Sequence, residues 1–113
     1  METAHLFPVQ KLDIYVAAKE LARRVQVAKI ADAELRDQAT RAAKSAFLCL
    51  CEGLPNEGIA MRRRYFVMAN NSLHETVAAL DLAATLGALG GSDAAEMQAL
   101  GLRVKRMLRA LMR

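Results

Sequence analysis

Residues 58–91 read GIAMRRRYFVMANNSLHETVAALDLAATLGALGG, and they form the longest stretch of the 113-residue chain with unbroken helical periodicity. Apolar or small side chains recur there every three or four residues, at Phe66, Ala69, Leu73, Val77, Leu80 and Ala84. This spacing places them on one face of an α-helix. Gly90 and Gly91 then interrupt the pattern. The stretch therefore predicts one long amphipathic helix over residues 58–89.

Two periodic segments precede this stretch. The first covers residues 8–30, and Pro8 suits its opening turn because the missing N–H has no helical partner there. The second begins after Asp32, a candidate N-cap, and ends at the helix breakers Gly53 and Pro55. The pattern leaves open whether the join before Asp32 separates two helices or bends one.

A fourth periodic segment closes the chain. Asp93 is a candidate N-cap with Glu96 three residues later, which is the spacing of a capping box. We expect the inner faces of the first, second and fourth helices to be formed by Ile14, Ala18, Leu21, Val25 and Ala28, by Leu35, Ala39, Ala42, Ala46 and Leu50, and by Met97, Leu100, Val104, Met107 and Leu111.

The composition favours an all-α protein. The chain holds 22 Ala and 16 Leu but only 7 Val and 3 Ile, and Ala and Leu favour helices whereas β-branched residues favour strands. Long amphipathic helices with short connections pack as antiparallel neighbours. We therefore predict a single domain over residues 1–113, folded as an antiparallel up-down four-helix bundle. Because 54% of the residues are hydrophobic, we expect some of them to cover a homo-oligomer interface.

The same composition excludes several classes of protein. The longest uninterrupted apolar run, residues 46–51, is far too short for a membrane-spanning helix. Lys11 follows the first apolar residues instead of preceding them, which is not the order of a secretory signal. A chain this apolar can also bury enough surface to offset the cost of ordering. We expect a folded cytoplasmic protein without a membrane partner.

Basic residues gather in two places. The chain carries a net charge of +4, and Arg62, Arg63 and Arg64 are consecutive near the start of the long helix. Cations at a helix N-terminus oppose the macrodipole, so the stability of that helix does not explain the run. The second cluster lies in residues 103–113, which contain no acid, and it consists of Arg103, Lys105, Arg106, Arg109 and Arg113.

Both clusters are candidate phosphate-binding sites for RNA or DNA, because arginine pairs bidentately with phosphate. Cations near a helix C-terminus are also favourable in their own right, so a solvated face or salt bridges between subunits is an equal alternative. Few aromatic residues accompany the arginines, which disfavours recognition of single strands by base stacking.

Catalytic and metal-binding patterns are missing from the sequence. Cys49 and Cys51 point away from each other on a helix, so they cannot chelate one metal, and only His5 and His74 could assist them. We interpret the cysteines as small core residues. The chain has no glycine-rich phosphate loop and no recognisable nucleophile motif. We expect no enzyme activity, no cofactor and no metal.

Two stretches resemble a known family. Arg-Ala-Ala-Lys-Ser at residues 41–45, followed by Glu52 and Gly53, is similar to the Arg-Ala-x-x-Ser … Ala-Glu-Gly signature of the bacterial four-helix bundle proteins encoded in intervening sequences of 23S ribosomal RNA genes. The family's second signature, an aromatic-rich turn followed by Ala-x-Gly-Ser-Leu-x-Glu, is matched by Tyr65, Phe66, Ala69, Ser72, Leu73 and Glu75. Asn71 stands where the family usually has Gly.

This resemblance implies a homopentamer of four-helix protomers with a positively charged face and a role in binding RNA or DNA. It also implies a fold similar to that of the accessory protein of diversity-generating retroelements, which works beside a reverse transcriptase. The alternative function is therefore a protein-interaction scaffold or accessory subunit that has no nucleic-acid affinity of its own.

The signature residues also have a structural interpretation. Arg41 and Glu52 are eleven residues apart and share a helix face, and Ser72 and Glu75 share another. A network such as Arg41 with Glu75 would fix the relative position of two helices with little net gain in stability. We favour this structural or interface role over direct contact with a ligand.

Overall fold

The computed structural model describes residues 6–113, which contain four α-helices, one 3-10 turn and no strand. The elements are the turn η2 (Pro8–Lys11) and the helices α1 (Asp13–Val27), α2 (Ala33–Gly53), α3 (Ile59–Thr85) and α4 (Gly91–Leu111). The prediction of an all-α protein with four helices is confirmed.

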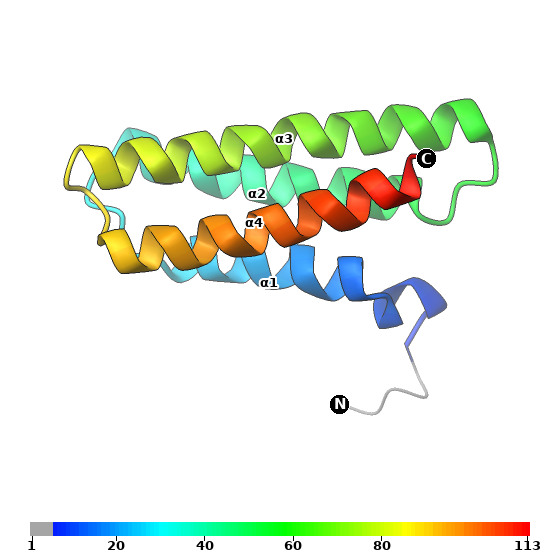
Figure 1. Ribbon diagram of the computed structural model, residues 1–113, viewed down its shortest axis with the longest axis horizontal. Coiled ribbons are helices and arrows are strands. Elements are labelled where there is room, and N and C mark those ends of the chain that lie inside the picture. The colour runs from blue at the N-terminus through cyan, green and yellow to red at the C-terminus, as the bar shows by residue number, and fades with distance from the viewer. Residues whose placement is uncertain (1–5) are drawn as a thin grey trace.

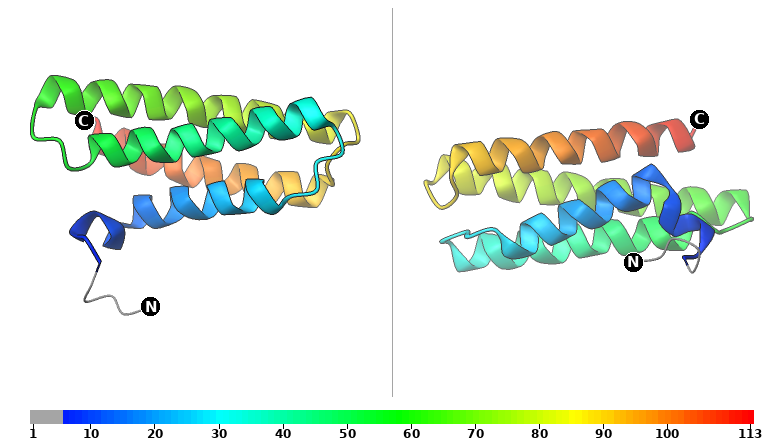
Figure 2. Two further views of the ribbon diagram at one scale, coloured as in Figure 1. Left: turned by 180° about the vertical axis from the view of Figure 1, so that it is seen from behind. Right: turned by 90° about the horizontal axis from the view of Figure 1, so that it is seen from below.

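The four helices lie side by side, and each traverses the molecule in the direction opposite to the one before it (Figure 1). The α1–α2 connection (residues 28–32) and the α3–α4 connection (residues 86–90) lie at one end of the molecule. The α2–α3 connection (residues 54–58) lies at the other end (Figures 1 and 2). A hydrogen bond of 2.8 Å from the Ala31 N–H to the Ala88 carbonyl joins the two connections at the first end.

The first helix is shorter than its periodicity predicts. Pro8 opens the 3-10 turn η2, and Leu12 has an extended backbone, with ψ at 138°, that separates this turn from α1. At the other end, Ala28 is also extended, with ψ at 139°, so α1 and α2 are two separate helices. The N-cap prediction is confirmed, since the Leu35 N–H donates to Asp32 Oδ1 at 2.9 Å.

The connection between α3 and α4 also differs from the prediction. Helix α3 ends at Thr85, not at residue 89, and Gly87 adopts a φ of +75° that only glycine accepts readily. The N-cap of α4 is Gly90, without a side-chain hydrogen bond, so the capping box predicted at Asp93 and Glu96 is wrong. The helix already begins at Gly91, so Asp93 lies inside its first turn and cannot cap it, and Glu96 instead accepts a 2.7 Å hydrogen bond from Arg24 of α1.

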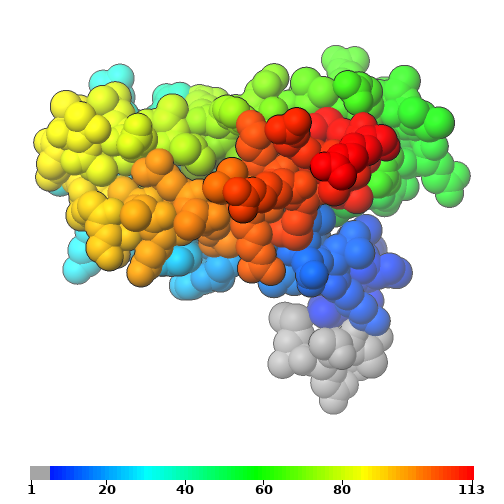
Figure 3. All heavy atoms as spheres, in the orientation of Figure 1, coloured from blue at the N-terminus to red at the C-terminus, as the bar shows by residue number. Residues whose placement is uncertain are grey.

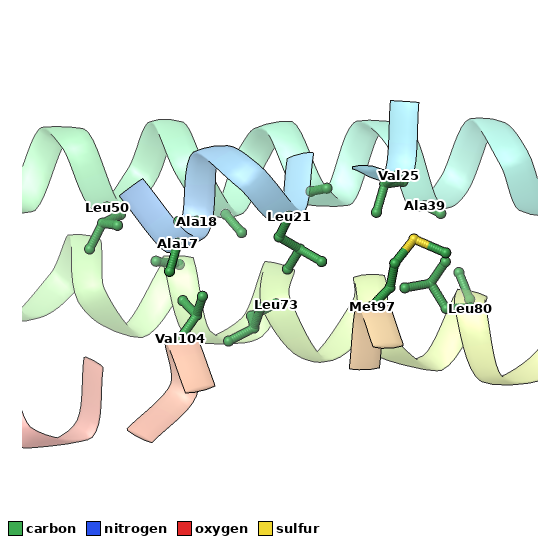
Figure 4. Close-up of a cluster of buried hydrophobic side chains, with 14 of the residues drawn as sticks. Ala17, Ala18, Leu21, Val25, Ala39, Leu50, Leu73, Leu80, Met97 and Val104 are labelled. Atoms are coloured by element: carbon green, nitrogen blue, oxygen red, sulfur yellow. The ribbon is translucent and has the colours of Figure 1, made fainter. Parts of the chain in front are cut away.

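All four helices contribute to one core. Figure 4 shows Leu21 and Val25 of α1, Leu50 of α2, Leu73 of α3 and Val104 of α4 converging on the interior. Most of the predicted inner-face residues are buried or half-buried. Leu111 is the exception, since 38% of it is exposed. The buried stripe of α4 instead runs through Ala94, Met97, Gly101, Val104 and Leu108.

Helices α2 and α3 pack closest to each other through small side chains. Ala42 and Ala46 of α2 are buried, as are Ala79 and Thr76 of α3. Gly53, the last residue of α2, is also buried: a Cβ on it would come within 2.7 Å of the Phe66 ring. The family-like Glu-Gly pair therefore ends in a glycine because α2 and α3 meet there without room for a side chain.

Among residues 6–113, no helix combines the length and the apolar character that crossing a bilayer requires.

Candidate nucleic-acid interface

The two basic segments lie at the same end of the molecule. Helix α3 begins where α4 finishes (Figure 1), and the end of α4, in red, lies against the start of α3, in green, in the space-filling view (Figure 3). The guanidinium of Arg63 reaches the carbonyl oxygen of Met112 at 3.5 Å. Clusters that are about forty residues apart in the sequence therefore form one basic end.

Arg62 is engaged within the protein. Its Nη1 donates a 2.8 Å hydrogen bond to the carbonyl of Leu54, the C-cap of α2, and its guanidinium lies 4.8 Å from the centre of the Phe66 ring. A cation at the C-terminus of a helix is favourable. The position of Arg62 is thus explained by the end of the neighbouring helix, a role that the sequence pattern did not show.

The remaining arginines of the two clusters are exposed. Arg63 makes only the long contact with Met112. Within the described part of the chain, the others form no ion pair and no hydrogen bond through their side chains; they are Arg64, Arg103, Arg106, Arg109 and Arg113. Arg106 and Arg109 follow one edge of α4 at an interval of three residues, and Arg113 lies two residues beyond the end of that helix. Their guanidinium groups are free to pair with phosphate oxygens.

Lys105 lies apart from the arginines of the C-terminal cluster. It is half-buried on the side of α4 that faces α3, where its Nζ contacts the Nε2 of His74. Sequence spacing alone did not connect these two residues, which are 31 positions apart. His5, the other histidine considered with the cysteines, lies outside the described residues.

The signature residues meet at the α2–α3 contact. Ser45 Oγ and Ser72 Oγ are 2.9 Å apart and share a hydrogen bond. Gln38 Nε2 donates to Glu75 Oε1 across the same contact. Ser45 and Gln38 were not among the predicted site residues, although Ser45 belongs to the quoted motif. Together these bonds fix how α2 and α3 sit against each other.

Arg41 and Glu75 border one polar groove of about 340 Å³, together with Gln38, Ala42 and Ser45. No ion pair joins Arg41 to Glu75 in the structure of residues 6–113. Arg41 Nε instead lies 3.4 Å from the Asp37 carbonyl of its own helix. Glu52 is exposed at the end of α2. Within one protomer, the hydrogen bond from Gln38 takes the place of the expected network.

Ion pairs in the described residues lie away from the basic end. Glu20 pairs with Arg23 at 2.6 Å, and Arg24 pairs with Glu96 at 2.7 Å. The hydrogen bond from Arg23 lowers the pKa of the Glu20 carboxyl. Neither of these ion pairs involves an arginine of the basic end.

The cysteines are free thiols on α2 and are half-buried. Cys49 packs against the core, with its Sγ 3.9 Å from Ser45 Oγ. Burial, and secondly the charge of Glu52, raises the pKa of the Cys51 thiol. In the part of the chain that the structure describes, no three His, Cys, Asp or Glu side chains are grouped so that they could hold a metal ion.

A comparison with protein families identifies the relatives of this chain. The family model described as 23S rRNA-intervening sequence protein matches residues 10–110. The chain belongs to this family. The match covers α1, α2, α3 and all but the last residue of α4, together with the Arg62–Arg64 run and most of the basic tail. No curated protein matches the chain. Membership in the 23S rRNA-intervening sequence protein family agrees with the resemblance that the signature residues showed.

Proposed function

We propose that this protein is a non-catalytic, homo-oligomeric RNA-binding protein that contacts the phosphates of structured RNA through its basic end. The observation that carries the proposal is the meeting of the two arginine clusters at one end of the molecule. The proposed phosphate ligands are the exposed side chains Arg63, Arg64, Arg103, Arg106, Arg109 and Arg113. Arg62 is a structural residue in this proposal, and Lys105 belongs to a different surface.

The chemistry of the basic end supports phosphate contacts without base reading. Phosphate contacts position a protein on nucleic acid and carry no sequence information directly. RNA is tested before DNA because the family description names an rRNA intervening sequence. A cytoplasmic location is part of the same proposal.

The oligomer is proposed to be a pentamer whose protomers are up-down four-helix bundles. Family resemblance supplies the number of subunits. Support from the structure comes from large apolar side chains that are more than half exposed: Phe7, Val27, Leu48, Ile59 and Leu86. They lie on different parts of the fold, and a subunit interface would cover those that face the neighbouring copy.

The test is light scattering on the purified protein, with and without a structured RNA, at about 50 and about 200 mM salt. We expect a particle of five chains that takes up RNA at low salt and releases it at high salt. The slope of log affinity against log salt is about −0.9 for each phosphate neutralised on a duplex. Affinity that does not change with salt would contradict phosphate binding, and a monomer would contradict the assembly.

A pair of variants locates the site. The double substitution Arg106→Gln with Arg109→Gln is expected to weaken RNA binding and to reduce the salt slope by about two. The control is Lys29→Gln with Lys44→Gln, which removes the same charge from exposed positions outside the basic end. Equal losses in the two variants would mean that net charge alone attracts RNA. An intact oligomer with no RNA affinity would favour the protein-scaffold alternative.

A further inference from the structure

A groove with a volume of about 430 Å³ lies between α3 and α4, outside the proposed RNA-binding residues. Its apolar lining includes Leu73 and Val77 of α3 and Ala99 and Leu102 of α4. Gly101 allows the two helices to meet at its base, since a Cβ there would lie 3.1 Å from Val77 Cγ2. In Figure 3, α3 and α4 lie next to each other along the face turned to the viewer. The groove is therefore an open apolar surface bounded by two helices.

One edge of this groove is positively charged. Lys105 lines it, half-buried, and its only side-chain partner in the described part of the chain is the His74 imidazole. No carboxylate lies within ion-pair distance of Lys105 among residues 6–113. An ammonium group beside apolar surface, with no anion to pair with, favours a ligand that brings a carboxylate.

We infer that this groove binds an amphipathic helix of a partner protein whose apolar side chains are followed by acidic residues. Apolar side chains one turn apart on such a helix would lie against Val77 and Leu102, as in helix-in-groove recognition. The acidic end of the bound helix would then lie over Lys105. This orientation follows because Lys105 lies at one end only of the apolar walls.

Composition favours such a helix over RNA, and the particle mass measured below distinguishes it from a second copy of this chain. RNA offers phosphates but no aliphatic groups for the apolar walls, and no Phe, Tyr or Trp lines the groove for base stacking. The inference does not depend on RNA binding at the basic end.

The experiment is a selection from a displayed library of single-helix peptides with randomised surface positions, using the full-length protein as target. We expect enriched peptides to combine an apolar stripe with Asp or Glu at one end of it. Their affinity is expected to fall about tenfold for Lys105→Glu, and to be regained when the peptide's acidic residues are replaced by Lys.

Leu102 and Leu82 provide a matched control, because each is 46% exposed and only Leu102 lines the groove. Leu102→Ser should weaken the selected peptides about tenfold, whereas Leu82→Ser should not, and both should leave RNA affinity unchanged. The inference is overturned if the affinity of the selected peptides is unchanged by both Lys105→Glu and Leu102→Ser. It is also overturned if the selected peptides are not enriched in Asp or Glu. A smaller particle for Leu102→Ser in light scattering would assign the groove to a second copy. If RNA displaced the peptides and Leu102→Ser also abolished RNA binding, the groove would be assigned to RNA. Either result also overturns the inference.

Discussion

The guanidinium of Arg62 on α3 donates a 2.8 Å hydrogen bond to the carbonyl oxygen of Leu54 at the end of α2. The bond spans the connection of residues 54–58 and satisfies a carbonyl that the helix itself leaves without a partner. Phe66 lies under the same guanidinium, at 4.8 Å from the ring centre. One arginine of a basic run therefore stabilises the α2–α3 hairpin, while its neighbour Arg64 is exposed.

Replacing Arg62 should reduce the stability of the protein without selectively weakening RNA binding. Arg62→Ala removes a charged hydrogen-bond donor and a cation–π contact, and we expect a loss of about 1–2 kcal/mol in the free energy of unfolding. Arg64→Ala removes the same charge from an exposed position on the same helix and should change stability by less than about 0.5 kcal/mol. Urea denaturation of both variants measures the difference. Equal stabilities would show that the Arg62 contacts contribute nothing.

Gly53 should not tolerate a side chain. Its added Cβ would lie 2.7 Å from the ring of Phe66, which is only 1% exposed and has no room to move away. We expect Gly53→Ala to destabilise the protein by about 1–3 kcal/mol through overpacking. Gly91→Ala is the control, because nothing lies within 4 Å of a Cβ on that first residue of α4. Thermal unfolding compares the two variants, and a neutral Gly53→Ala would contradict the close packing of α2 on α3.

Ser45 and Ser72 should behave as a coupled pair. Either single substitution to Ala leaves the other hydroxyl without its partner, and we expect each to cost about 0.5–1.5 kcal/mol of stability. The double variant should lose less than the sum of the two, with a coupling of about 0.5–1 kcal/mol. A double-mutant cycle by chemical denaturation measures this term. Additive losses would mean that the two hydroxyls do not depend on each other.

Cys51 should react slowly with alkylating reagents. Burial raises the pKa of its thiol, so a smaller fraction is thiolate at mildly alkaline pH than for an ordinary cysteine. Because the pKa of Cys51 is higher in the folded than in the unfolded protein, its contribution to the free energy of unfolding is fully present below the unfolded-state pKa. That contribution is lost as the pH rises through the folded-state pKa. Iodoacetamide labelling followed by mass spectrometry, with the urea-unfolded chain as control, gives the rates. Equal rates in folded and unfolded protein would refute the expectation.

Much of the fold could be predicted because helix periodicity and glycine positions are local properties of the chain. For this reason local patterns predict the cap at Asp32 and the buried positions Leu21, Leu50 and Leu73 on their separate helices. The boundaries were less accurate. The end of α3 is set by Gly87 in its left-handed conformation, and the spacing of apolar residues alone does not reveal which glycine adopts it.

The candidate site was only partly predictable. Both arginine clusters can be recognised in the sequence, but the sequence does not show that their basic side chains have different surroundings in the fold. Arg62 turns to a carbonyl, Lys105 turns to His74, and Arg106 is exposed. The groove between α3 and α4 could not be predicted, because its walls come from residues about 25 positions apart in the sequence.

By itself, the sequence determined that this protein is all-α, where its helices approximately lie, which face of each is apolar and where positive charge gathers. Those properties depend on residues within a few turns of each other. Only the tertiary structure decided that the start of α3 and the end of α4 form one basic end, that Ser45 meets Ser72, and that Gly53 must remain small. These relationships arise where side chains distant in sequence compete for the same space and the same hydrogen-bond partners, and local periodicity carries no information about that competition.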